Sequence, residues 1–315
     1  MTSVLVGVDG GGTHTRAMVT DEAGVQLASS DGIGSAIRPG EVTRSADIVA
    51  STIEAAIRES AVEDPQVRIA CVGVAGAGRE EERHALHEAL VSRGIADEVH
   101  VVTDAEIALE DAFGDGPGVL LIAGTGSICY GRGPAGAVAR CGGWGPIIGD
   151  EGSGAWLGRR VLGVVAAAAD GREPDTALTA AILATTGVPS VDALVPWASH
   201  ATVAQLASLA PVIMETAKAG DLRANAIVTL GVEELALHVR TLARQLFVDE
   251  RATVPLALSG GLVHKGTLVR KRLEVRLRSM VPGAMLHGDE VIAVRGAIKR
   301  AMRTPSGIVA RQRGG

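Results

Sequence analysis

Two glycine-rich turns, each following an apolar run, bring together groups that suit phosphate chemistry. The first is Val8-Asp9-Gly10-Gly11-Gly12-Thr13, and the second is Ala123-Gly124-Thr125-Gly126-Ser127. Because glycine tolerates positive φ and has no Cβ, successive backbone N–H groups can approach an anion closely. Thr13, Thr125 and Ser127 add hydroxyl donors, and the Asp9 carboxylate suits Mg²⁺, directly or through water. One such turn fits an ordinary hairpin. The repetition, with Asp9 in place, favours two phosphate-binding turns.

A further carboxylate, Asp104, ends the apolar run 101–103. Ligands of α/β proteins bind in the crevice beyond the carboxyl ends of strands, where this side chain would lie. There it could accept a proton from a hydroxyl that attacks a phosphoryl group. It could equally be the N-cap of a helix over 105–113. The residues alone leave both interpretations open.

The stretch 141–154 contains six glycines around Trp144, Asp150 and Glu151. Such a composition suits a ligand loop more than a core, because backbone and ring can both approach a small polar molecule. We expect Asp150 to hydrogen-bond sugar hydroxyls. The alternative is that Asp150, Glu151 and Ser153 only cap a helix that begins near Gly154.

A third glycine pair, Gly260-Gly261, follows Ser259 at the end of a predicted strand over 255–258. A strand–Gly-Gly–helix junction suits the flat approach of a nucleotide's adenine or ribose. A tight turn without a ligand fits these residues equally well.

Length and composition limit the classes of partner and function that the chain can have. The chain has 315 residues, is 47% hydrophobic and carries a formal net charge of -6, so neither nucleic acid nor a membrane surface is an expected partner. The three cysteines, Cys71, Cys129 and Cys141, lack metal-site spacing. His84 and His87 lie on a charged predicted helix, where we expect them to be solvated. The N-terminal residues lack the layout of a signal peptide, and we expect a cytoplasmic protein.

The elements that position these residues follow from hydrophobic periodicity and turn residues. We expect strands over 3–9, 14–20, 25–31, 68–75, 99–104, 118–123, 127–133, 136–141 and 255–258. We expect helices over 41–61, 80–93, 105–113, 151–170, 175–186, 201–219, 221–248, 265–280 and 289–303. The order strand, glycine turn, two strands occurs twice, and we expect the domain junction at 114–118, between the two occurrences. Interleaved strands and helices predict α/β architecture.

Together these segments resemble the actin-like ATPase superfamily, which includes sugar kinases, actin and Hsp70-type chaperones. Asp9–Thr13 is similar to its first phosphate motif, Gly124–Ser127 to the second, and Leu258–Gly261 to the adenosine motif. Within the superfamily, Gly142–Gly145 and Gly149–Gly154 are similar to the N-acetylglucosamine kinase branch of the BadF/BadG/BcrA/BcrD ATPase family. The resemblance covers about residues 3–300, with the motifs in the expected order.

The resemblance implies two actin-like (ribonuclease H-like) domains, each a mixed sheet flanked by helices, with an ATP and sugar cleft between them. It implies an N-terminal domain over 1–114 and a C-terminal domain with a helical insertion over 115–294. The segment 295–315 would supply a helix that packs back on the first domain, followed by a frayed tail from 304. A homodimer is also implied.

The activity implied is that of an ATP:hexosamine 6-phosphotransferase acting on N-acetylglucosamine or glucosamine, with ATP and Mg²⁺. Asp104 would be the general base for the sugar's 6-hydroxyl, and Asp9 would hold the metal. The ATP-binding residues implied are Gly10, Gly11, Gly12, Thr13, Gly124, Thr125, Gly126, Gly260 and Gly261. The sugar-binding residues implied are Ser127, Gly143, Trp144, Gly145 and Asp150.

One departure bears on the sugar. Ala36 stands where the family usually has an asparagine that contacts sugar hydroxyls, and Ile128 stands where some members have asparagine. A lost buried polar partner costs about 1–3 kcal/mol, enough to change sugar choice. The family resemblance leaves two other functions open, and Ala36 supports only the second of them. One is an ATP-driven redox activator, which would need Cys129 and Cys141 as iron–sulfur ligands. The other is a sensor that binds ATP or sugar without turnover.

Overall fold

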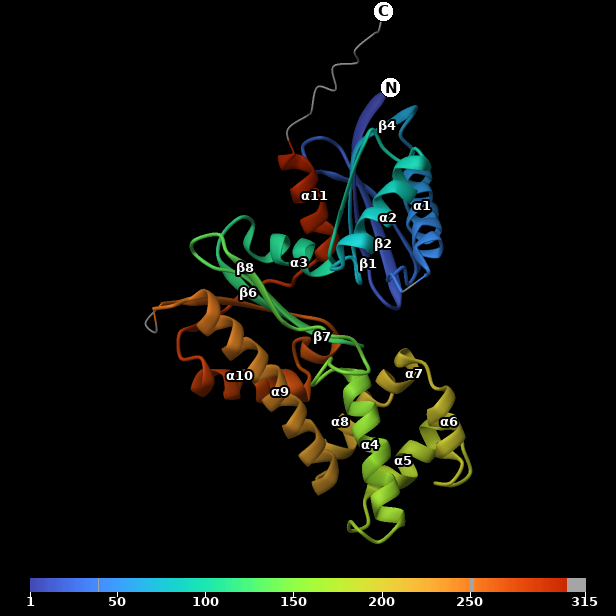
Figure 1. The fold of residues 1–315 in the computed structure, drawn as a ribbon, viewed down its shortest axis with the longest axis vertical. Helices are drawn as coiled ribbons and strands as arrows, with labels where there is room; N and C mark the ends of the chain where they lie inside the picture. The colour runs from blue at the N-terminus through green and yellow to red at the C-terminus, as the bar shows by residue number, and fades with distance from the viewer. Residues whose placement is uncertain (39, 250–251, 305–315) are drawn as a thin grey trace, which may run out of the picture. The chain divides into compact units, whose positions relative to one another are not determined.

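The computed structural model describes residues 1–38, 40–249 and 252–304. The chain divides into two compact units, one formed by Met1–Gly114 with Ile292–Gly315 and the other by Asp115–Val291. The sequence placed the second boundary after residue 294, and the observed division precedes it by three residues. Figure 1 shows the two units with their elements labelled.

The first unit is built on a five-stranded mixed sheet in the order β3-β2-β1-β4-β5. Strands β1, β2 and β3 run antiparallel to one another in succession, whereas β4 and β5 continue the sheet in parallel from β1. The strands are β1 (Thr2–Gly10), β2 (His14–Thr20), β3 (Gln26–Ile33), β4 (Pro65–Val74) and β5 (Glu98–Val102). The helices are α1 (Val42–Glu59), α2 (Glu80–Ser92), α3 (Asp104–Phe113) and α11 (Ala293–Arg303).

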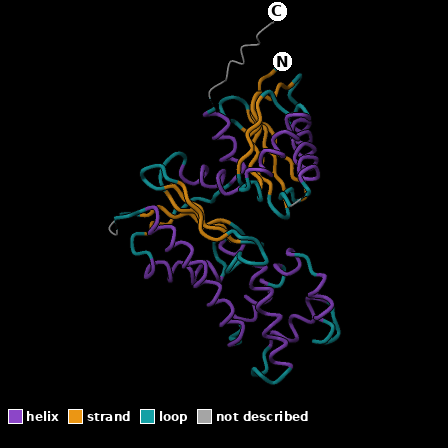
Figure 2. The backbone as a smooth tube through the Cα atoms, viewed as in Figure 1, coloured by secondary structure: helices purple, strands orange, loops and turns teal. Residues whose placement is uncertain are grey.

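Alternation along β1 divides the core of this unit into two layers. Val4, Val6 and Val8 join the cluster that includes the buried faces of α1 and α2, while Leu5 joins the cluster that includes residues of α3 and α11. Gly7 lets α11 approach, since a Cβ there would come 2.8 Å from the Val294 carbonyl oxygen. Figure 2 shows strands in orange between helices in purple. Helices therefore cover both faces of the sheet.

An ion-pair cluster joins α11 to α3 although the two helices lie far apart in the sequence. The Asp111 side chain is fully buried, and its Oδ1 lies 2.5 Å from Arg295 Nε and 2.9 Å from Lys299 Nζ. Although burial alone raises the pKa of Asp111, the hydrogen bonds from Arg295 and Lys299 lower it overall. The C-terminal helix is thereby fastened to the first unit.

The second unit repeats the strand plan of the first. Its sheet has the order β10-β9-β6-β7-β8, with β6, β7 and β8 antiparallel in succession and β9 and β10 added in parallel from β6. The strands are β6 (Gly118–Ala123), β7 (Ser127–Arg132), β8 (Val138–Gly142), β9 (Val254–Ser259) and β10 (Ala284–Leu286). Strands β6 to β10 thus correspond, in order, to β1 to β5.

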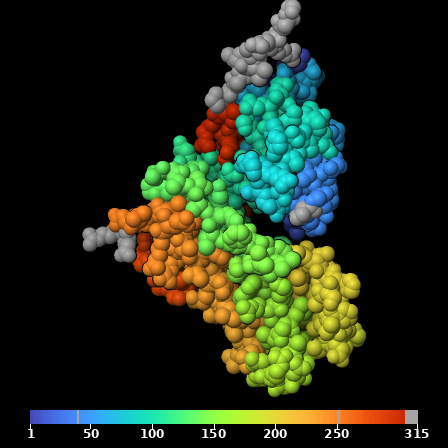
Figure 3. Space-filling view, in the orientation of Figure 1, coloured from blue at the N-terminus to red at the C-terminus, as the bar shows by residue number. Residues whose placement is uncertain are grey.

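A long helical segment enters this unit between β8 and β9. It comprises α4 (Gly154–Ala169), α5 (Ala177–Thr186), α6 (Leu194–His200), α7 (Val203–Ala207), α8 (Ala210–Lys218) and α9 (Leu222–Leu246). The green-to-yellow surface in Figure 3 belongs to α4 through α7. Helix α9 contacts β6, β7 and β8, and one continuous apolar core includes its buried face and theirs. The short 3-10 helix η1 (Gly261–Val263) and α10 (Leu268–Met280) follow β9.

The observed elements depart from the sequence prediction where caps and short elements decide the boundaries. The predicted helix over 201–219 is two helices. The first, α7, has Thr202 as its N-cap and ends at Ala207, and the second, α8, starts at Ala210. Helix α6 and the three-residue strand β10 were not predicted from the sequence. The predicted frayed tail lies almost entirely outside the described residues. Among the described residues, no helix combines the length and apolarity needed to cross a membrane.

Candidate active site

In the first unit, Asp9 lies near the carboxyl end of the central strand β1. Its neighbours across the sheet are Arg16 on β2 and Gly73 on β4. The pKa of Asp9 is raised to about 7, mainly by burial and then by the charge of Asp104, while Arg16 acts in the opposite direction. Asp104 therefore lies near enough to Asp9 for its charge to disfavour the ionised form of Asp9.

The first glycine turn is packed against the loop that carries Ala36. A Cβ on Gly10 would lie 2.3 Å from Ser35 Oγ, and one on Gly34 would lie 2.3 Å from the Gly12 carbonyl oxygen. The Ala36 amide donates to the Gly11 carbonyl at 3.1 Å. The loop and the turn thus form one rigid piece of backbone. The side chain at position 36 is held next to the predicted phosphate turn.

Asp104 is the first residue of α3, directly after the strand end. The N-cap is Thr103, whose hydroxyl accepts from the Glu106 amide while Glu106 accepts from the Thr103 amide, a complete capping box. The interpretation of Asp104 as the N-cap is therefore wrong. Its own Oδ1 accepts from the Ala105 amide at 2.9 Å. Burial raises the pKa of Asp104 to about 6, which is the range a general base needs near neutral pH.

In the second unit, the second glycine turn is in direct contact with Asp150. A Cβ on Gly126 would lie 2.8 Å from Asp150 Oδ2, so only glycine fits beneath this carboxylate. The Gly145 amide donates to Asp150 Oδ1 at 3.2 Å, and the backbone N–H of Ser127 is a second donor. Burial nevertheless raises the pKa of Asp150. The residue has a φ of +56°, a backbone conformation that costs energy outside glycine.

The predicted caps of α4 resolve to a single residue. Ser153 is the N-cap, because its hydroxyl accepts from the Trp156 amide, and Asp150 makes no cap contact. Trp156 packs against the main core of this unit. Trp144 is 62% exposed, with the Arg140 guanidinium carbon 4.3 Å from its ring centroid. Asp150 is therefore free of a capping role.

The Gly260 turn closes the same end of the second sheet. Gly260 has a φ of +97°, and a Cβ there would lie 2.4 Å from the Ala123 carbonyl oxygen. The Gly154 amide at the start of α4 donates to the Gly124 carbonyl at 2.8 Å. The two predicted ATP motifs of this unit, Gly124–Gly126 and Gly260-Gly261, thus lie side by side at the ends of β6 and β9.

A cavity of about 520 Å³ opens beside Gly260 and Gly261 within the second unit. Its lining adds His264, Lys265 and Asp289, none of which the sequence analysis named. Lys265 Nζ donates to the Gly288 carbonyl at 2.8 Å and so joins the two walls. No local pattern marks these residues, because the loop before α11 approaches η1 only in the folded chain.

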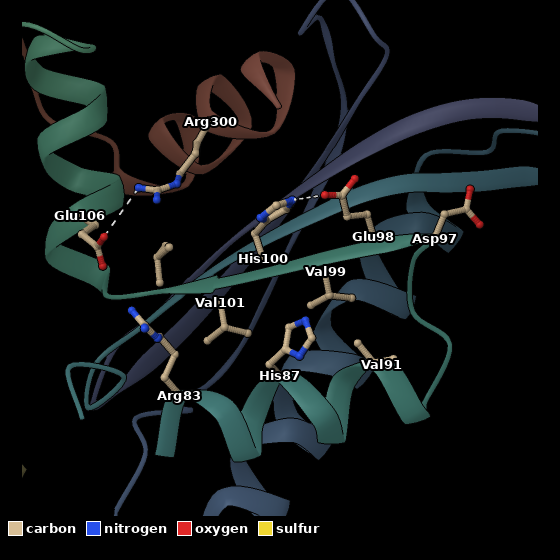
Figure 4. A pocket seen from close by; sticks show the side chains of 11 residues that line it. Arg83, His87, Val91, Asp97, Glu98, Val99, His100, Val101, Glu106 and Arg300 are labelled. Atoms are coloured by element: carbon tan, nitrogen blue, oxygen red, sulfur yellow. Dashed lines mark hydrogen bonds and ion pairs between the residues drawn. The ribbon is translucent and has the colours of Figure 1, made fainter. Parts of the chain in front are cut away.

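A second cavity, of about 590 Å³, lies along β5 in the first unit and contains none of the predicted site residues. Figure 4 shows His100 turned toward Glu98 and Arg300 of α11 turned toward Glu106. The distances are 2.8 Å from His100 Nε2 to Glu98 Oε1 and 3.7 Å from Arg300 Nη1 to Glu106 Oε1. These charged residues pair with one another, and none of the predicted site residues lines the cavity. The cavity is therefore not part of the candidate site.

The cysteines are poorly suited to bind an iron–sulfur cluster. Cys129 and Cys141 face each other across β7 and β8, but Cys129 is fully buried, and burial raises the pKa of its thiol well above the usual range. In the part of the chain that the structure describes, no group of three or more His, Cys, Asp or Glu side chains could hold a metal ion. A magnesium ion would need phosphate and water ligands besides Asp9.

Such a magnesium site suits the donor chemistry of the first unit. Mg²⁺ takes oxygen ligands and is commonly held by one or two carboxylates together with substrate phosphates. Asp9 supplies a carboxylate beside a glycine turn, and a bound cation would relieve its repulsion with Asp104. The residues present therefore fit the ion.

The fold and these turns define the class of the protein, a chain of two actin-like α/β domains. A solved structure from Chromobacterium violaceum, provisionally named an N-acetylglucosamine kinase, superposes with a TM-score of 0.78 at 30% identity, covering 94% of this chain and 98% of that one. The profile of the BadF/BadG/BcrA/BcrD ATPase family matches residues 6–298. The chain belongs to the BadF/BadG/BcrA/BcrD ATPase family.

Two curated relatives carry kinase names. An N-acetylmuramic acid/N-acetylglucosamine kinase of Clostridium acetobutylicum is 36% identical over 196 residues, which are 62% of this chain and 64% of that kinase. An N-acetyl-D-glucosamine kinase of Dictyostelium discoideum is 27% identical over 294 residues, 89% of this chain and 92% of that kinase. These names inform the proposal that follows.

Proposed function

We propose that the protein is an ATP-dependent kinase that phosphorylates the 6-hydroxyl of an amino sugar, N-acetylglucosamine in the first place. The observation that carries this proposal is Asp104, a carboxylate with a pKa raised by burial to about 6 at the carboxyl end of β5. Its charge acts on Asp9, which directly precedes the first glycine turn. The kinase names of the relatives support the same reaction.

ATP binding is assigned to backbone groups of both units. Gly10–Thr13 in the first unit, and Gly124–Gly126 in the second, would donate N–H groups to phosphate oxygens, with the Thr13 and Thr125 hydroxyls beside them. Gly260-Gly261 and the adjoining cavity would take the adenosine. Asp9 would hold Mg²⁺, which supplies positive charge to the transferred phosphoryl group.

Sugar binding is assigned to the second unit. Asp150 presents a carboxylate that two backbone N–H groups already orient, and such a group accepts hydrogen bonds from sugar hydroxyls. Gly143, Trp144 and Gly145 would supply backbone and ring contacts around it. The Ser127 hydroxyl donates to the Glu151 carbonyl at 2.8 Å, so it would meet the sugar as an acceptor.

Asp104 would act on the sugar hydroxyl. Its ionised carboxylate accepts the proton as the 6-oxygen attacks the terminal phosphorus of ATP, the bond from that phosphorus to the bridging oxygen breaks, and ADP leaves. Ala36, held beside the phosphate turn, leaves space where a longer polar side chain would restrict the sugar.

A coupled ADP-release assay over a panel of N-acetylglucosamine, glucosamine, N-acetylmuramic acid and glucose tests the proposal. We expect turnover that depends on an amino sugar and falls about 100- to 10,000-fold in Asp104→Ala. Turnover without sugar dependence, or unchanged turnover in Asp104→Ala, would contradict it. Binding of sugar without phosphorylation would indicate a sensor instead.

The homodimer expected from the family is part of the proposal. Sedimentation equilibrium of the purified chain, with and without sugar and nucleotide, measures its mass directly. A single species of about twice the chain mass supports the dimer, and a monomer under all conditions removes it.

A further inference from the structure

Helix α9 places a buried histidine beneath the loop that carries Asp150. His238 is 8% exposed and lies on the apolar stripe of the helix, between Leu235 and Leu242. A neutral, unpaired polar side chain on such a stripe is costly, so a contact must compensate for its burial. The contact is with Glu151, the residue next to Asp150.

Helix α9 contacts the loop that carries Asp150 at two points. His238 Nε2 lies 3.5 Å from Glu151 Oε2. The imidazole also fills the space beside Gly142, where a Cβ would come 2.8 Å from Nε2. One turn earlier on the helix, Leu235 fills the space beside Gly152, where a Cβ would come 2.6 Å from its Cγ. Both ends of the segment 142–152 therefore rest on α9.

Glu151 is in turn tied to the second glycine turn. Its carbonyl oxygen accepts from Ser127 Oγ at 2.8 Å. Its Oε2 is buried and makes no hydrogen bond of ordinary length within the residues that the structure describes, and His238 Nε2, 3.5 Å away, is the polar group that faces it. A buried carboxylate oxygen that loses its last partner carries the full desolvation cost. Loss of the histidine would therefore drive Glu151 toward water and move Asp150 with it.

We propose that His238 is a positioning residue of the sugar site: it donates from Nε2–H to Glu151 and so holds Asp150 in the orientation that binds sugar hydroxyls. This rests on the proposed sugar kinase function. Nδ1 is buried and has no hydrogen-bond partner among the described residues, which suits the tautomer that carries its proton on Nε2.

The charge state of His238 is consistent with this role. Burial lowers its pKa, whereas Glu151, Glu234 and Asp150, the charged groups that act on it, favour the protonated form. The net shift is downward, so the ring is neutral at neutral pH. A neutral donor leaves the negative charge of Glu151 in place.

The test compares His238→Leu, which keeps bulk without a donor, with His238→Gln, which keeps an N–H donor. We expect the KM for N-acetylglucosamine to rise roughly 10- to 100-fold in His238→Leu, with the KM for ATP within about threefold of wild type. His238→Gln should recover most of this loss. In a double-mutant cycle, Glu151→Gln should add little to His238→Leu.

Val228→Ala is the matched control. Val228 is fully buried on the same helix, so its truncation weakens packing of α9 without touching the loop. We expect a lower free energy of unfolding and an unchanged sugar KM. An unchanged sugar KM in His238→Leu, equal losses in the Leu and Gln variants, or the same sugar defect in Val228→Ala would each overturn the proposal.

A readout that needs no substrate separates this proposal from the kinase proposal. With Trp156→Phe and Trp197→Phe, Trp144 is the one tryptophan left, and its fluorescence reports the loop. We expect His238→Leu to shift its emission and His238→Gln to leave it unchanged. If the wild-type protein phosphorylates no sugar while this pattern holds, the kinase proposal fails and the positioning of the loop stands. Equal emission in all variants refutes the positioning itself.

Discussion

Replacing Asp104 by Asn should stabilise the first unit at neutral pH while it removes the proposed base. The carboxyl has a pKa of about 6 in the folded chain, against an ordinary value of 3.8, so folding favours its protonated form. At about 1.4 kcal/mol per pH unit of difference, ionised Asp104 lowers the free energy of unfolding by about 3 kcal/mol above pH 6. Asparagine has no charge to desolvate and can still accept from the Ala105 amide.

The sign of the effect follows from proton linkage. Because the folded pKa lies above the unfolded one, the cost is absent below about pH 3.8, grows between 3.8 and 6, and is constant above that. The gain from Asp104→Asn should follow the same course. Asp111→Asn is the control, since the pKa of Asp111 is lowered, and its loss should destabilise at neutral pH and less so in acid.

Hydrogen exchange is the suitable assay, because Trp144, Trp156 and Trp197 all lie in the second unit and cannot report the first by fluorescence. Exchange of peptides from α3 and β4, corrected for intrinsic rates, gives the free energy of opening between pH 4.5 and 8. A destabilising Asp104→Asn, or a gain that is equal at all pH values, would refute the argument that burial raises the pKa of this carboxyl.

Three further predictions concern activity. With saturating Mg²⁺ and ATP, kcat/KM for the sugar should fall about tenfold per pH unit below pH 6, because protonated Asp104 cannot accept a proton. A pH profile that stays flat to pH 5 would exclude Asp104 as the base. Gly126→Ala should raise the sugar KM at least about tenfold by displacing Asp150, whereas Gly163→Ala, in open space within α4, should leave kinetics unchanged. Gly34→Ala should separate its loop from Gly12 and raise the KM for ATP, which steady-state kinetics at fixed sugar would measure.

Local chemistry was enough to predict most of the fold. The apolar run over 3–9 and the glycine turn after it predicted β1, because a central strand that is covered on both faces is apolar almost throughout. The repeated order of strands predicted the second sheet. Short elements could not be predicted in this way: β10 has three residues, and α7 has only five before α8 begins at Ala210.

The glycine turns of the candidate site could be predicted from local sequence, whereas the contacts between distant segments could not. Gly10–Thr13, Gly124–Ser127 and Gly260-Gly261 stand out because glycine is needed for their backbone. The contact of Asp150 with Gly126, and of His238 with Glu151, joins segments that are distant in the sequence and are brought together by packing of α9 on the sheet. No local pattern carries that information.

The central claim is that this chain transfers a phosphoryl group from ATP to the 6-oxygen of an amino sugar with Asp104 as base. Phosphorus and proton NMR of the product, with wild-type protein and Asp104→Asn run side by side on N-acetylglucosamine, test it most directly. The account predicts a 6-phosphate formed by the wild type and about 100- to 10,000-fold slower by the variant. Phosphate on another oxygen, inorganic phosphate alone, or equal rates would contradict it.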